Sequence, residues 1–153
     1  MTNYDYQNTT NRIKVVLLRA PMVVPKMSHV FSICPPLGLA YVAAAIQKAN
    51  FEVRSIDALG EAPFQKIIFK SNKNFLNVGL STSQILEHLA KKDFDVLFVS
   101  LMFSHDWPMS KIIIKEIKKK YPNKLLVCGG EHITASPEFC MEDCPDIDIC
   151  IFG

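Results

Sequence analysis

The chain has 153 residues, 49% of them hydrophobic and 21% charged, which is the composition of an ordinary globular protein and a length typical of one domain. Its formal net charge of +2 gives no reason to expect a nucleic-acid partner, and the lysines gathered at 111–120 are interpreted as the solvated face of one helix. Because no apolar run reaches the ~18 residues that a membrane-spanning helix needs, no membrane association is expected.

Residues 1–12 are polar and are predicted to form a disordered tail. They lack the apolar segment of a secretory signal, and the five cysteines are odd in number, so a reduced, cytoplasmic protein is expected. Cys140 and Cys144 stand four residues apart, but a pair without a third close ligand is a weak metal signal. Two unlinked thiols are the favoured interpretation, and no metal site is predicted.

Residues 13–57 have the pattern of one βαβ unit. Residues 13–20 are nearly continuous in apolar character, which is typical of a strand buried on both faces of a parallel sheet. A long loop that ends in Pro35 and Pro36 precedes a helix that is apolar nearly all round and therefore expected to be buried, with Asn50 suited to its end. Residues 51–57 alternate apolar and polar, which indicates a strand nearer the edge.

Residues 58–79 carry the weakest pattern and are predicted to be a loop or a short helical insertion. Ser81 and Gln84 form a capping box at the start of the next helix, and Asp106 is expected to cap a longer one that Pro122 ends. Three further strands are predicted, over 95–100, 124–128 and 147–152. A short helix is expected around 136–143.

Strands that alternate with helices predict an α/β fold with a doubly wound, all-parallel sheet. Five strands without a dinucleotide fingerprint favour the flavodoxin-like strand order 2-1-3-4-5. In such a sheet, ligands bind at the carboxyl edge, here in the loops after the first, third and fourth strands.

The loop after the first strand excludes several ligands. There is no Gly-x-Gly-x-x-Gly and no Walker motif, so neither a dinucleotide nor a nucleoside triphosphate is expected. Residues 19–21 and Ser100 stand where a phospho-acceptor domain needs acidic side chains. Residues 21–27 are apolar and bounded by prolines, which suits a large, mostly apolar, planar ligand; a loop packed on its own side chains is the alternative.

In order and spacing, six segments resemble the N-terminal cobalamin-binding domain of B12-dependent radical SAM enzymes. The matching segments are 14–21, 35–44, 51–58, 129–135, 144–148 and 151–153. The resemblance implies a cobalamin-binding domain over 13–153, with the corrin ring over the carboxyl edge and the nucleotide tail running down beside the loops after the third and fourth strands.

The resemblance also implies a set of cofactor-binding residues and no catalytic residue. The set is Pro21, Pro35, Pro36, Leu37, Gly38, Ser100, Leu101, Met102, Ser104, Gly129, Gly130, Glu131 and His132. Glycines allow a benzimidazole to approach the backbone, and a hydroxyl can meet its free nitrogen, although a plain strand-to-loop turn would also explain Gly129 and Gly130. A tryptophan at Gly130 is expected to block corrinoid binding without unfolding the domain.

Two features of the wider family are missing. Many cobalamin domains carry Asp-x-His-x-x-Gly, whose histidine ligates cobalt, and this chain has no such motif; His29 has no carboxylate beside it in sequence. Base-off cobalamin without a histidine ligand is therefore predicted. His105 and His132 are interpreted as loop hydrogen-bonding residues.

The cluster motif Cys-x-x-x-Cys-x-x-Cys is also missing, since Ile147 stands where the third cysteine belongs. An iron–sulfur cluster and S-adenosylmethionine are expected only in an absent partner domain, a radical SAM barrel in cis or in trans. The chain is then a module of a radical SAM methyltransferase or cyclase that is not catalytic alone. The alternative is a flavodoxin-like interaction domain that has lost corrinoid binding.

Overall fold

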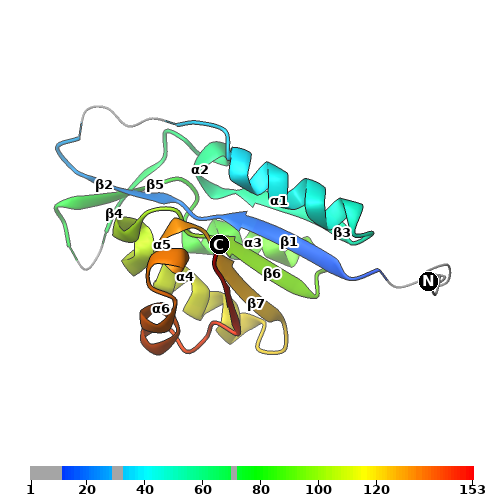
Figure 1. Ribbon diagram of the computed structural model, residues 1–153. Coiled ribbons are helices and arrows are strands. Elements are labelled where there is room, and N and C mark those ends of the chain that lie inside the picture. Colours follow the sequence, from blue (N-terminus) through cyan, green and yellow to red (C-terminus); the bar gives the residue numbers. More distant parts are fainter. Residues whose placement is uncertain (1–11, 29–32, 70–71) are drawn as a thin grey trace, which may run out of the picture.

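The computed structural model describes residues 12–28, 33–69 and 72–153. Most of the predicted disordered tail, residues 1–11, and His29 lie outside the described residues, while Arg12 is exposed. The described residues form a five-stranded sheet with helices on both faces and a smaller three-stranded sheet beside it (Figure 1).

All neighbours in the larger sheet are parallel. Across the sheet the strands are β3 (Glu52–Asp57), β1 (Lys14–Arg19), β6 (Val96–Ser100), β7 (Leu125–Gly129) and β8 (Ile149–Ile151). This arrangement confirms the predicted order 2-1-3-4-5, with the alternating strand β3 at the edge.

Alternate residues of β1 build two separate cores. Val15 and Leu17 face α1 (Leu37–Lys48), while Val16 and Leu18 belong to the larger core. That core also contains buried residues of α3 (Thr82–Ala90) and α4 (Trp107–Lys120). Complete burial of a leucine side chain stabilises a fold by roughly 1.5–3 kcal/mol, so this strand anchors both layers.

The prediction that α1 is a buried helix is wrong. Leu39 is its buried residue, whereas the side chains of Leu37 and Tyr41 are 68% and 78% exposed. One side of α1 packs on the sheet through Leu39 and its neighbours, and the other side faces outward in the described part of the chain. The end of the helix is as predicted, because Asn50 adopts a left-handed φ of 66° after it.

The smaller sheet was missed from the sequence. It pairs β2 (Met22–Pro25), β5 (Phe75–Val78) and β4 (Lys66–Ile68) in antiparallel fashion. The short helix expected in 58–79 exists as α2 (Ala58–Glu61). Strands of three or four residues are too short to show a clear alternation of apolar and polar side chains. Because β2 pairs with a segment far along the chain, its partner cannot be recognised from the neighbouring sequence either.

Two predicted caps have different outcomes. Ser81 and Gln84 form the predicted capping box at α3. Asp106 closes the 3₁₀ helix η1 (Ser104–Asp106) and precedes α4, but its carboxylate makes no cap bond; it accepts the backbone N–H of Val23 at 2.6 Å. The carboxylate therefore ties β2 to the start of α4. The last helices are α5 (Glu131–Ala135), which was not predicted, and α6 (Pro137–Asp143).

Candidate functional site

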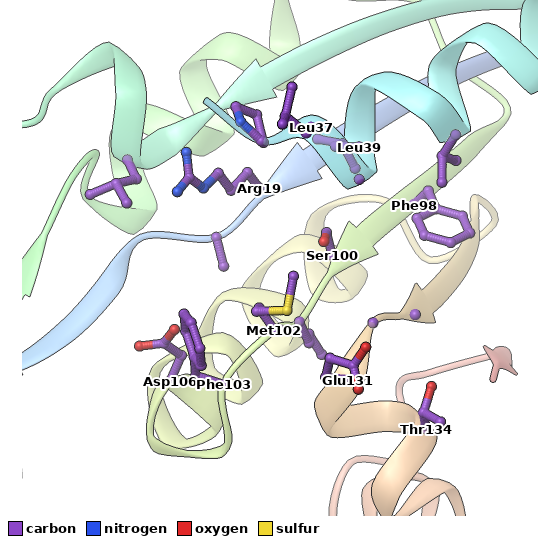
Figure 2. Close-up of a pocket in the computed structure, with 18 of the residues that line it drawn as sticks. Arg19, Leu37, Leu39, Phe98, Ser100, Met102, Phe103, Asp106, Glu131 and Thr134 are labelled. Atoms are coloured by element: carbon purple, nitrogen blue, oxygen red, sulfur yellow. The ribbon is translucent and has the colours of Figure 1, made fainter. Parts of the chain in front are cut away.

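A cavity of about 730 Å³ lies at the carboxyl edge of the large sheet. Its walls come from the ends of β1, β6 and β7 and from the first turn of α1, as Arg19, Ser100 and Leu37 show in Figure 2. The lining is mainly apolar, and the volume falls within the ~300–1,000 Å³ typical of small-molecule and cofactor sites.

The structure brings most of the predicted site residues together around this cavity. The ten that line it are Pro35, Pro36, Leu37, Gly38, Ser100, Leu101, Met102, Gly129, Gly130 and Glu131. Pro21, Ser104 and His132 are not among the lining residues. Their contact with a cofactor, like that of the other ten, stays a prediction.

Several lining residues were missed from the sequence. They include Arg19, Leu39, Phe98, Phe103, Asp106 and Thr134, which Figure 2 labels. Phe98 could have been found, because it is two residues before Ser100 and side chains alternate along a strand. Leu39 required the position of α1 on the sheet, which the sequence pattern does not give.

Two glycines, the last residue of β7 and the residue after it, bring backbone to the cavity wall. A Cβ at Gly129 would lie 2.9 Å from the Phe98 ring. Gly130 has a φ of +108°, and a Cβ there would lie 2.4 Å from the carbonyl oxygen of Leu101. A side chain at Gly130 would disturb the fold as well as the cavity. The expectation that Gly130→Trp blocks binding without unfolding the domain is therefore wrong.

Arg19 fixes the loop that leads into α1. Its Nη1 donates to the backbone oxygen of Cys34 at 2.9 Å and lies 3.4 Å from Oδ2 of Asp57. The arginine side chain is 17% exposed. It therefore holds residues 34–36 against the cavity and leaves a positive charge in its wall.

Behind the cavity lies a buried cluster centred on His132, which is 7% exposed. Its Nδ1 is 3.0 Å from Oγ of Ser104, and its Nε2 is 3.4 Å from Sγ of Cys140. Burial lowers the pKa of His132 and raises the pKa of Cys140 to about 11, so both groups are neutral near pH 7. These contacts agree with the interpretation of His132 as a hydrogen-bonding residue.

Lowering the pH through the range below about 6.5 is expected to destabilise the fold through His132. Since burial lowers its pKa in the folded chain, the unfolded chain takes up the proton first as the pH falls. The free energy of unfolding therefore decreases as the pH falls from the pKa of the unfolded chain to the lower pKa of the folded chain. Of the groups beside it, Cys140 stays neutral, and Asp143, which accepts from Trp107 and Lys111, has a lowered pKa and stays charged.

Thermal unfolding midpoints at about pH 7.5 and about pH 5.5 measure this effect. His132→Asn removes the titrating ring and should show a smaller fall in midpoint between the two pH values. Carboxyl groups titrate equally in both proteins, so the difference isolates His132. An equal fall in both proteins would contradict the assignment.

Sequence comparison relates the chain to corrinoid proteins. The family model described as "B12 binding domain" matches residues 25–153. The chain is 29% identical over 145 residues to a cytidylyl-2-hydroxyethylphosphonate methyltransferase of Streptomyces wedmorensis, and 28% identical over 141 residues to an uncharacterized methyltransferase of Pyrococcus horikoshii. These matches cover 94% and 92% of this chain, but it spans only 27% of the length of either relative.

Structure comparison bears on the fold alone. A response regulator of Thermotoga maritima superposes with a TM-score of 0.51 at 8% identity, covering 92% of this chain and 86% of the regulator. A signal receiver domain of Pseudomonas fluorescens gives 0.53 at 9% identity, covering 93% and 82%. Both are flavodoxin-like receiver domains, in agreement with the predicted fold class.

The described residues lack two kinds of feature. They contain no group of three or more His, Cys, Asp or Glu side chains arranged to hold a metal ion. Within the same residues, no helix is both long enough and apolar enough to cross a membrane. All five cysteines are free thiols.

Proposed function

This chain belongs to the B12 binding domain family, and on that premise we propose that residues 13–153 are the corrinoid-binding module of a B12-dependent radical SAM methyltransferase. The observation that carries the proposal is the mainly apolar cavity at the carboxyl edge, which Gly129 and Gly130 line without side chains. A flat ring can approach the backbone closely at positions without side chains, and the glycines leave this part of the cavity wall bare.

The chemistry of the cavity wall fits a corrinoid. Leu37, Leu39 and Met102 offer apolar surface for the faces of a macrocycle, and Met102 extends into the cavity in Figure 2. Ser100 supplies a hydroxyl beside the glycines, where it can bond to the nitrogen of a nucleotide base. Arg19 and the loop it holds form one side of the cavity.

When bound, a corrinoid supplies a cobalt centre that carries and transfers a methyl group. The chain's own residues hold the ring and orient it, so that one face is presented to chemistry performed outside this module. The module is not catalytic alone in this proposal. The apolar wall and the two glycines bind the ring, and this role requires no proton transfer by any residue.

A titration with hydroxocobalamin tests the proposal. Purified protein should bind the corrinoid, retain its colour through desalting and change its visible spectrum with a stoichiometry of one. A protein that stays colourless after incubation would instead support the flavodoxin-like interaction domain that has lost corrinoid binding. Unfolded protein incubated in the same way controls for adsorption.

The cobalt is expected to be base-off and without a histidine ligand. No histidine is among the described residues that line the cavity, and the motif that supplies one in other cobalamin domains is missing. Electron paramagnetic resonance of the bound Co(II) form should therefore show no nitrogen superhyperfine splitting. Splitting that is present in the unaltered protein and disappears in His29→Ala would refute this expectation.

A radical SAM barrel is the proposed partner, in cis or in trans, and it would hold the iron–sulfur cluster and S-adenosylmethionine. The relatives are almost four times as long as the matched segment, which supports further domains in such proteins. Leu37, Met102 and Phe103 line the cavity and are each about half exposed or more, so a partner that covers the cavity mouth would bury them.

A further inference from the structure

Ser104 and His132 contact each other just behind the cavity wall. Neither lines the cavity, although both adjoin segments that do. We infer that this pair positions the loop 101–104, and through it the cavity wall formed by Met102 and Phe103. The inference rests on the proposed corrinoid-binding function and gives both residues a positioning role instead of contact with the cofactor.

The loop is tied to other elements at both ends and carries two half-exposed side chains between them. At its start, Leu101 donates its N–H to Gly129 at 2.8 Å and accepts from the N–H of His132 at 3.2 Å. At its end, the Ser104 hydroxyl lies 3.0 Å from the His132 ring. Between these points, Met102 and Phe103 are each 49% exposed and line the cavity. Phe103 is also held from its C-terminal side, because its ring stacks on that of His105 at 5.3 Å and its carbonyl oxygen accepts from the N–H of Asp106. The two ends of the loop therefore set the position of Met102 most directly.

The imidazole is itself held in place from the opposite side. Cys140 of α6 contacts Nε2 at 3.4 Å, and the ring of Trp107 lies 5.2 Å away. A neutral imidazole has one donor and one acceptor nitrogen, which matches one partner on each side. His132 thus links the buried Cys140 of α6 to the end of the loop 101–104.

The two contacts of the ring can be separated by mutation. Ser104 is exposed, so Ser104→Ala removes the bond to the loop without opening a hole in the core. Cys140 is fully buried, so Cys140→Ala removes the other contact and lowers stability through lost packing. A positioning role predicts that the serine variant affects corrinoid binding without a matching loss of stability.

The experiment measures two properties of each variant. Absorbance titration gives the affinity for hydroxocobalamin. Amide hydrogen exchange without corrinoid reports opening of the loop through the N–H groups of Leu101 and Asp106, which donate to the carbonyl oxygens of Gly129 and Phe103. Ser104→Ala should bind about five- to tenfold more weakly, the usual effect of losing one hydrogen bond, with an unchanged thermal midpoint and faster exchange. Ser104→Thr, which keeps the hydroxyl, should restore both properties.

A matched control is Ser83→Ala, an exposed serine of α3 whose hydroxyl contacts Ser81 and not the loop. It should leave affinity and exchange unchanged. Wild-type affinity together with wild-type exchange in Ser104→Ala would overturn the inference. If unaltered protein fails to bind hydroxocobalamin, the proposed function fails, while the exchange data still decide whether Ser104 and His132 hold the loop.

Discussion

Replacing Gly38 by tryptophan is expected to weaken hydroxocobalamin binding by more than about 100-fold, or about 2.7 kcal/mol, while leaving the fold intact. Gly38 lies in the first turn of α1 and lines the cavity. A Cβ at this position would meet no other heavy atom within 4 Å, so an indole can enter the cavity without displacing the protein. A helical glycine is also less favourable than most residues, by up to about 1 kcal/mol relative to alanine.

Ala45→Trp is the matched control for this variant. Ala45 is an exposed residue of the same helix and is not among the residues that line the cavity. Visible titration should show normal affinity for Ala45→Trp, and thermal unfolding should show both variants folded. If Gly38→Trp binds as tightly as the control, the corrinoid does not occupy this cavity.

The second large effect concerns stability. Gly130→Ala is expected to lower the free energy of unfolding by about 2–4 kcal/mol, because it adds a strained positive φ to a backbone collision. The φ is +108°, and the new Cβ would lie 2.4 Å from the oxygen of Leu101. For a chain of this length, the thermal midpoint should fall by roughly 5–15 °C.

Urea unfolding of Gly130→Ala and Gly38→Ala measures this difference directly. The same substitution at Gly38 meets open space in a helix and should be neutral or stabilising by up to about 1 kcal/mol. Equal stability of the two variants would show that the turn after β7 relaxes easily. Gly130 would then be an ordinary loop glycine instead of part of a tight contact between two loops.

Most of the large sheet was predictable because its evidence is local. Val16, Leu17 and Leu18 are consecutive apolar residues, and such a run is typical of a strand buried on both faces. Ser81 and Gln84 carry a capping signal within four residues. The small sheet was not predictable, since Met22 pairs with Val78 and neither short strand identifies the other.

The site residues also fall into those that the sequence predicts and those that depend on tertiary structure. Ser100 and Gly129 end their strands, and the ends of parallel strands share one edge, so their proximity follows from topology. Whether a loop side chain turns into the cavity depends on tertiary packing. His132 turns away because Ser104 and Cys140 satisfy its ring, and Leu37 is exposed because only one side of α1 meets the sheet.

The lining residues of the cavity come from both ends of the chain, so the cavity wall cannot form until late in synthesis. Arg19 on the first strand and Phe152 after the last strand line the same cavity, so the wall is complete only when β8 has joined the sheet. A ribosome releases about 5–20 residues per second from the N-terminus onward. For many seconds a nascent chain therefore has the first wall without the last one. A cofactor that needs both walls would load only after the sheet is complete and would not guide its first steps.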